Sequence, residues 1–131
     1  MNEPIWVSKR AVLAVHHEQI AEHGGSSGIR DESLLDSALA KAHNVFAYGE
    51  RPDIFTLAAS YAFGIARNHP FIDGNKRTAL TTSMMFLDRN NWEIDVPLAD
   101  CYVTFLQLAD GTVSEQELAA WFRENAIPLK I

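Results

Sequence analysis

Apolar residues along this chain recur every three or four positions, the spacing of helices that bury one face. The first such stretch starts after Ser8, a residue type that caps helices well, and extends to about His23. Gly24 and Gly25 then stop the helix. Its inward face is expected at Val12, Val15, Gln19 and Ile20.

The second helical stretch begins after Asp31, another favourable capping residue, and follows a loop over residues 26–30. Between residues 44 and 52 the helical period is lost, and Gly49 and Pro52 disfavour regular structure. We expect an extended loop or a small hairpin there. The inward positions of this second helix are Leu34, Leu35, Ala38, Leu39 and Ala42.

A third helix is predicted over residues 54–67, capped by Asp53, and a fourth over residues 76–90. The third is apolar on nearly every side, which is typical of a helix that runs through the core. Residues 68–75 break the pattern and connect the two helices. The fourth helix has core spacing at Leu80, Met84 and Leu87.

Two further helices follow. The first has Pro97 in its opening turn and ends at Gly111. The second opens with Ser114 and Glu117 in the spacing of a capping box. Its apolar face is Leu118, Trp121 and Phe122. No strand of convincing length is visible, so the sequence predicts an all-α fold of about six helices packed around the third and fourth.

Composition narrows the class of protein. A chain of 131 residues, 47% of them apolar, can bury a core of its own, and we expect a single domain over residues 1–131. The net charge of −6 argues against a surface that binds nucleic acid directly. The longest apolar stretch, residues 54–66, is too short to cross a membrane. Cys101 is the only cysteine and no signal peptide is visible, so we expect a cytoplasmic protein without disulfides.

One connection between helices concentrates reactive side chains: residues 69–77, His-Pro-Phe-Ile-Asp-Gly-Asn-Lys-Arg. Pro70 disfavours the right-handed helical conformation at His69, so the third helix must end there. Phe71 is the apolar residue that would anchor this loop in the core. The carboxylate of Asp73 offers the oxygen ligand that magnesium prefers.

The residues after Asp73 open a helix and create a candidate anion site. The N–H groups of Gly74, Asn75 and Lys76 would point out of the first turn without helical partners, which suits phosphate. The side chains of Lys76 and Arg77 add positive charge. A nearby histidine, His69, is able to take a proton from a hydroxyl near neutral pH.

Taken one at a time, these residues have ordinary structural interpretations. An Asp73-Gly74 pair can form a turn, Asn75 can cap a helix, and His69 can pack in a core. The complete set in this order is much harder to explain in that way. For Arg30 a ligand contact is one interpretation, and the sequence favours the other, a plain loop. The first helix contains three histidines, His16, His17 and His23. Their spacing favours a solvated helix face over a metal site.

Residues 69–77 resemble the signature of the Fic/Doc superfamily, His-x-Phe-x-Asp/Glu-Gly/Ala-Asn-Gly/Lys-Arg. Two further blocks are similar to the death-on-curing (Doc) toxins of that superfamily. One lies within residues 28–39 and opens with Gly-Ile-Arg-Asp; the other is residues 61–66, Tyr-Ala-Phe-Gly-Ile-Ala. The similarity extends over about residues 5–125 and implies the Fic fold, with the motif on a central helix-loop-helix.

The resemblance implies a role for each residue of the motif, with ATP as co-substrate and Mg²⁺ bound beside it. The implied roles are His69 as general base, Phe71 as loop anchor, Asp73 as metal ligand, Gly74 and Asn75 as anion hole, and Lys76 and Arg77 as catalytic cations on phosphate.

Two positions imply a kinase. Most Fic enzymes transfer AMP and have glycine where this chain has Lys76 and a second arginine where it has Leu80. Doc toxins share the lysine, lack the second arginine and transfer the γ-phosphoryl group of ATP. The implied function is a toxin kinase that phosphorylates a threonine or serine hydroxyl of a translation protein, with elongation factor Tu as the known target of the branch. Two alternatives stay open: a Fic-type AMP transferase and a non-enzymatic helical binding module.

The resemblance also implies an antitoxin partner, whose C-terminal segment would bind as a helix in an apolar groove. An internal inhibitory helix, Ser/Thr-x-x-x-Glu-Gly/Asn, is not expected. The one candidate, Glu124-Asn125, has Ala120 at the position that needs the hydroxyl. Residues 44–51 occupy the place of the Fic flap that holds the target chain, and an ordinary surface loop is the competing interpretation.

Overall fold

The computed structural model describes residues 2–50 and 52–129, and most of that length is helical. In chain order the elements are α1 (Lys9–His23), α2 (Glu32–Tyr48), α3 (Ile54–Asn68), α4 (Asn75–Arg89), β1 (Trp92–Ile94), α5 (Leu98–Asp110), α6 (Glu115–Asn125) and β2 (Ala126–Pro128). The expected all-α class is confirmed. Among the described residues, no helix has both the length and the apolarity of a membrane span.

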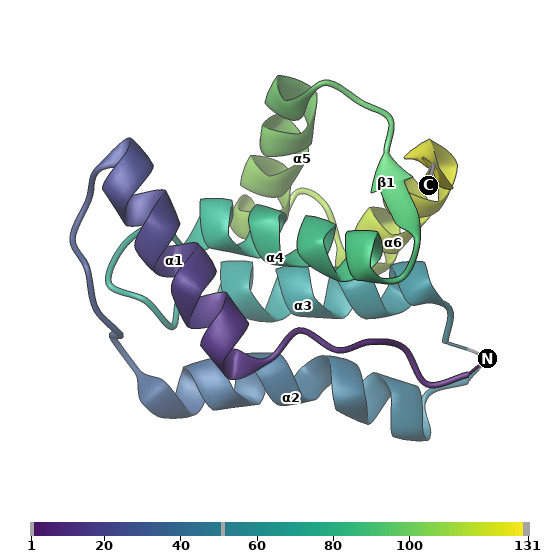
Figure 1. Cartoon of the computed structure of the whole chain (residues 1–131), viewed down its shortest axis with the longest axis horizontal. Coiled ribbons are helices and arrows are strands. Elements are labelled where there is room, and N and C mark those ends of the chain that lie inside the picture. The colour runs from purple at the N-terminus through teal and green to yellow at the C-terminus, as the bar shows by residue number, and fades with distance from the viewer. Residues whose placement is uncertain (1, 51, 130–131) are drawn as a thin grey trace.

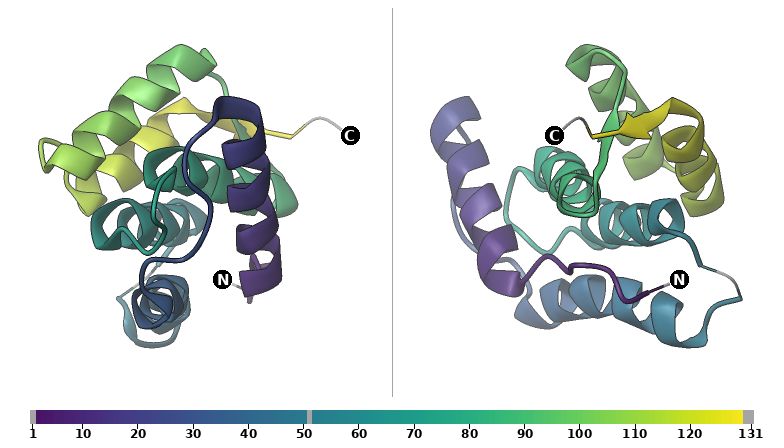
Figure 2. Two further views of the ribbon diagram at one scale, coloured as in Figure 1. Left: turned by 90° about the vertical axis from the view of Figure 1, so that its left-hand side faces the viewer. Right: turned by 45° about the vertical axis from the view of Figure 1, so that its right-hand side comes forward.

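Helices α3 and α4 lie side by side in the middle of the molecule (Figure 1). Helices α2 and α6 pack against α3, while α1 and α5 pack against α4. Figure 2 shows that the connection from α1 to α2 passes beside the connection from α3 to α4. The candidate chemistry of residues 69–77 therefore lies where two connections meet, between α1 and α5.

Helix α3 forms the centre of the core, as its apolar sequence predicts. Ten of its fifteen residues are buried, and Leu57 and Ile65 are completely enclosed. Gly64 allows α2 to approach closely, because a Cβ at this position would lie 3.0 Å from the backbone of Ala38. Removing such enclosed side chains from a helix that touches several others is strongly destabilising in general.

The predicted side-chain caps are present at the starts of four helices. The side chains of Ser8, Asp31 and Asp53 accept backbone N–H groups at the starts of α1, α2 and α3. Ser114 and Glu117 form the predicted capping box of α6. In contrast, α4 begins after Gly74 with no side-chain cap. Its first N–H groups are therefore available to a ligand.

The predicted loop or hairpin over residues 44–52 is wrong for most of its length, because α2 continues to Tyr48. Val45 and Phe46 extend the apolar stripe of α2 by one turn and pack against the core. Phe46 meets Trp6 edge-on, with ring centroids 5.6 Å apart. The segment compared with the Fic flap is thus helical up to Tyr48, and residue 51 lies outside the described residues.

Two short strands were not predicted. β1 and β2 pair antiparallel, with Trp92 opposite Pro128 and Ile94 opposite Ala126. Strands of three residues are too short for an alternating pattern to stand out in the sequence. The pair fastens the segment after α6 to the segment after α4.

One carboxylate ties α3 to α6. Asp53 accepts a hydrogen bond from the N–H of Thr56 and pairs with Arg123, Nη2 to Oδ2 at 2.8 Å. Partial burial raises the pKa of Asp53, but the hydrogen bonds from Thr56 and Arg123 outweigh this effect and hold its pKa below the usual 3.8. The ionised carboxylate therefore stabilises the fold.

We predict that Asp53→Ala lowers the free energy of unfolding at neutral pH by about 1–2 kcal/mol, because α3 loses its cap. Asp53→Asn keeps a capping oxygen and loses only the charge, so it should lose less than about 1 kcal/mol. Because the folded-state pKa is lowered, the advantage of wild type over Asp53→Asn is present at neutral pH and should disappear below about pH 4. Urea unfolding across this range measures both effects; an advantage that grows in acid contradicts the assignment.

Candidate active site

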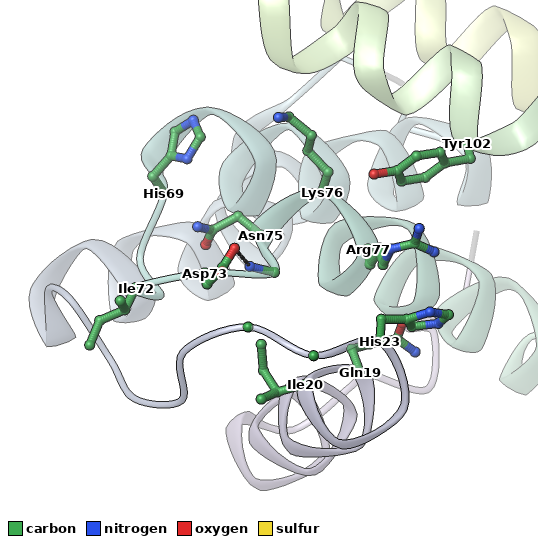
Figure 3. A pocket seen from close by; sticks show the side chains of 13 residues that line it. Gln19, Ile20, His23, His69, Ile72, Asp73, Asn75, Lys76, Arg77 and Tyr102 are labelled. Carbon is green, nitrogen blue, oxygen red and sulfur yellow. Dashed lines mark hydrogen bonds between the residues drawn. The ribbon is translucent and has the colours of Figure 1, made fainter.

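A cleft of about 540 Å³ opens where the loop between α3 and α4 faces the end of α1 (Figure 3). Most of the motif lines it, and α1 and α5 complete its walls. Figure 3 shows His69 toward one end of the cleft and Arg77 with Tyr102 toward the other. The lining residues are Gln19, Ile20, His23, Gly24, Gly25, His69, Ile72, Asp73, Gly74, Asn75, Lys76, Arg77 and Tyr102.

Phe71 anchors the loop, as predicted from its apolar side chain. It is 1% exposed, and its ring stacks on the imidazole of His16 with centroids 3.8 Å apart and planes 7° apart. His16 also forms a hydrogen bond from Nε2 to the backbone oxygen of Asp73, 2.8 Å long. The prediction of a solvated face is therefore wrong for His16, which is buried and supports the loop from α1.

Asn75 closes the loop from within. Its side-chain oxygen accepts the N–H of Phe71, and its side-chain nitrogen donates to the carbonyl of Phe71, both at 3.0 Å. The side-chain amide of Asn75 thus binds both backbone groups of Phe71, and the residue is 7% exposed. The backbone N–H of Asn75 lies in the first turn of α4, where it can contribute to an anion hole.

His69 ends α3 in a left-handed conformation, with φ 49° and ψ 56°. Such a conformation is uncommon for a residue with a side chain and is found preferentially at functional sites. Arg30 supports it by donating from Nε to the carbonyl of His69 at 2.7 Å and from Nη2 to that of Asn68 at 2.9 Å. Arg30 is therefore a structural support of the site, which its interpretation as a plain loop residue missed.

Backbone hydrogen bonds hold the two connections together. The N–H groups of Arg30 and Asp31 donate to the carbonyl of Pro70, and that of Ile72 donates to the carbonyl of Gly28. The exposed imidazole of His69 has no hydrogen-bond partner within residues 2–50 and 52–129. Its ring nitrogens are therefore open to a hydrogen bond with a ligand in the cleft.

The start of α4 provides a row of donors. Gly74, in the left-handed region at φ 77°, turns the chain into the helix, and its own N–H donates to Asp73 Oδ1 at 2.9 Å. The N–H groups of Asn75, Lys76 and Arg77 have no acceptor in the described part of the chain. These three, rather than Gly74, form the open end of the helix that attracts anions.

Two cations stand beside this row without acidic partners. Lys76 and Arg77 are half-buried, and no carboxylate of the described chain pairs with either. The guanidinium of Arg77 instead lies over the ring of Tyr102, 4.5 Å from its centroid. Both positive charges are therefore available to a ligand in the cleft.

Asp73 presents an exposed carboxylate at the same end of α4. It accepts from Gly74 and, more weakly, from the N–H of Ser26 at 3.3 Å, which leaves lone pairs on both oxygens. Among the described residues no group of three His, Cys, Asp or Glu side chains could hold a metal alone. A single carboxylate beside a phosphate site does fit magnesium, which binds few protein ligands and shares the phosphates of its substrate.

The structure thus brings all the predicted site residues to one loop and one helix start, with Phe71 beneath them. Leu80 is 5% exposed and packs in the core, three residues beyond Arg77. His16, Arg30 and Tyr102 were missed, because each belongs to a distant part of the sequence and reaches the loop only in the folded chain.

Comparison with known proteins agrees with this geometry. The model of the Fic/DOC family matches residues 6–87, which span α1 to α3 and most of α4 with the whole motif. The chain belongs to the Fic/DOC family. The resemblance of the motif is thereby confirmed, whereas Tyr102 on α5 lies beyond the matched residues.

Two relatives within the Fic/DOC family are similar over different lengths. The chain is 34% identical over 119 residues to the protein kinase doc of Escherichia phage P1, covering 89% of this chain and 92% of that protein. It is 38% identical over 72 residues to the toxin Doc of Mycolicibacterium smegmatis, covering 54% of this chain and 55% of that protein.

The glycines after α1 offer a matched test of how the Asp73 carboxylate is held. A Cβ at Gly25 would lie 2.7 Å from Asp73 Oδ2, whereas a Cβ at Gly24 would meet nothing within 4 Å. Both glycines have positive φ, 114° and 80°, so alanine strains the backbone at either position.

We predict that Gly25→Ala displaces the Asp73 carboxylate and weakens its bond to the N–H of Gly74, whereas Gly24→Ala does not. The amide resonance of Gly74 in a ¹H–¹⁵N spectrum reports this bond, and it should move in the first variant only. Both variants should lose about 1 kcal/mol or more of stability. Equal movement of the Gly74 resonance in both would show that strain, and not contact with Asp73, is responsible.

Proposed function

We propose that this chain is the toxin of a toxin–antitoxin pair and that it transfers the γ-phosphoryl group of ATP to a hydroxyl of a translation protein. The observation that carries the proposal is the arrangement around one loop of an imidazole, a row of N–H groups and two cations, none paired within the described residues, together with one carboxylate. Sequence similarity to the protein kinase doc of phage P1 also supports phosphoryl transfer.

In the proposed complex, the N–H groups of residues 75–77 and the side chains of Lys76 and Arg77 hold the phosphates of ATP. Charge-assisted hydrogen bonds of this kind are stronger than neutral ones and orient the phosphates. Asp73 would hold a magnesium ion shared with the phosphates, which would neutralise part of their charge. Together these groups would hold the phosphates in the cleft that His69 also lines.

The proposed transfer needs one proton acceptor. The hydroxyl oxygen of the target attacks the γ-phosphorus as the bond from this phosphorus to the β–γ bridging oxygen breaks, and ADP leaves. The hydroxyl proton passes to the free nitrogen of His69. Lys76 and Arg77 balance the negative charge on the phosphates, which requires that no acidic residue neutralise them first.

Lys76 is the residue that favours transfer of the γ-phosphoryl group over transfer of AMP. Its long, charged side chain lines the cleft, where the AMP-transferring relatives have glycine. Its bulk obstructs the phosphate position that those relatives use, and its charge offers a different phosphate contact. The second arginine of those relatives is replaced here by Leu80, whose apolar side chain is buried in the core.

The proposed target is a threonine or serine of elongation factor Tu, and the proposed location is the cytoplasm, where translation takes place. The proposed regulator is an antitoxin that folds a terminal helix into an apolar groove of the toxin. ATP labelled at the γ- or the α-phosphorus tests the reaction on purified elongation factor Tu. Transfer of the γ-label supports the kinase, transfer of the α-label supports an AMP transferase, and transfer of neither supports a binding module.

We predict that His69→Ala abolishes growth arrest and slows phosphoryl transfer about 10²- to 10⁴-fold, because the hydroxyl loses its proton acceptor. His17→Ala, an exposed histidine on α1, is the matched control and should behave as wild type. The measurements are colony survival at equal expression and the initial rate with γ-labelled ATP. A His69→Ala protein that remains toxic while folded would falsify the assignment.

We also predict that Lys76→Gly removes phosphoryl transfer without creating an efficient AMP transferase, since the second arginine is still absent. Lys76→Ala controls for the roughly 1 kcal/mol that glycine loses within a helix, and it should be equally inactive. The mass of the modified target separates a phosphoryl from an AMP adduct. A phosphoryl product formed at the wild-type rate by either variant would refute the role of Lys76.

A further inference from the structure

We propose that Tyr102 is a positioning residue of this site: its ring holds the guanidinium of Arg77 against the cleft while leaving all of its hydrogen-bond donors to phosphate. Tyr102 is the one residue of α5 among the described residues that line the cleft. The centre of the Arg77 guanidinium lies 4.5 Å from the ring centroid, within the range of a cation–π contact.

An aromatic partner suits a phosphate-binding arginine better than a carboxylate would. A carboxylate would occupy two guanidinium N–H groups and cancel the positive charge. A ring attracts the cation through its face, accepts none of the in-plane N–H donors and adds no net charge. Arg77 is thus held in place before phosphate arrives, which reduces the entropy lost on binding.

The position of Tyr102 differs from that of its neighbours along the same side of α5. The helix is fixed to the core through Cys101, Phe105 and Leu108, which are all buried. One turn before and after Tyr102 on the same side of the helix, Leu98 and Leu106 are exposed, at 71% and 37%. Tyr102, between these two exposed leucines, is half-buried: it packs against the edge of the core and lies under the guanidinium of Arg77.

The core helps to hold the ring in place, since Tyr102 packs against it. Cys101 immediately before Tyr102 is 2% exposed, and Phe105 three residues later is fully enclosed. The hydroxyl of Tyr102 points toward the middle of the cleft in Figure 3. Ring and hydroxyl could therefore act separately, and the experiment must distinguish them.

The test uses the full-length chain and measures the binding of inorganic pyrophosphate, without added metal, by calorimetry. Tyr102→Leu should weaken binding about three- to tenfold, because the cation–π contact is lost. Tyr102→Phe and Tyr102→Trp should bind within about twofold of wild type, since each retains a ring. Leu106→Ala, an exposed neighbour on α5, is the matched control and should not change binding.

A merely structural role is excluded by combining variants. If Tyr102 acts through Arg77, adding Tyr102→Leu to Arg77→Ala should cause no further loss of pyrophosphate affinity. An equal loss in both backgrounds overturns the proposal, as does unchanged binding in Tyr102→Leu. A loss in Tyr102→Phe as large as that in Tyr102→Leu overturns it in favour of a hydroxyl contact.

The inference rests on the proposed function only in treating the cleft as a phosphate site. If pyrophosphate binding depends on the ring but the protein transfers no label from ATP, the role of Tyr102 stands and the proposed kinase activity is rejected. For an active kinase, Tyr102→Leu should raise the KM for ATP by the same three- to tenfold factor and change kcat by less than about twofold. Wild-type protein that binds neither pyrophosphate nor ATP would reject both proposals.

Discussion

The two hydrogen bonds between the side-chain amide of Asn75 and the backbone of Phe71 determine the shape of the whole loop. Only a side chain with both a donor and an acceptor can satisfy the N–H and the carbonyl of the same residue. By doing so, Asn75 draws the loop back over its own helix start. Phe71 is then directed into the core, and the intervening residues are directed toward the cleft.

Two side chains from earlier segments, one on α1 and one on the connection between α1 and α2, support this loop. His16 from α1 lies flat against Phe71 and bonds to the backbone of Asp73, while Arg30 bonds to the last carbonyls of α3. Neither residue need touch a substrate. Together they keep a flexible connection in one conformation, so that the donors and charges are already in place when a ligand arrives.

Much of the fold could be predicted because its signals are local. The caps at Ser8, Asp31 and Asp53 and the all-round apolarity of α3 are each contained in a few consecutive residues. The motif is also continuous in sequence, so its resemblance to the Fic/DOC family was visible. Within the motif, however, the sequence did not reveal that the side-chain amide of Asn75 binds the backbone of Phe71.

What could not be predicted depends on contacts between distant segments. Val45 and Phe46 extend α2 because Trp6 and the core receive them, and β1 forms only because β2 returns beside it. The interpretation of His16 failed for the same reason, since its own helix gives no indication that Phe71 will lie beneath its ring. Intrinsic preference is a weak guide wherever tertiary packing supplies the stabilisation.

The connection between α1 and α2 has an unusual property for a surface segment. Loops generally tolerate changes in length, but this one pairs with the loop between α3 and α4 through backbone hydrogen bonds in a fixed register, with Ile29 opposite Phe71. One inserted residue would shift that register and carry Arg30 away from the carbonyl of His69. Evolutionary variation in loop length should therefore be confined to connections elsewhere in this fold, such as that around Gly111 after α5.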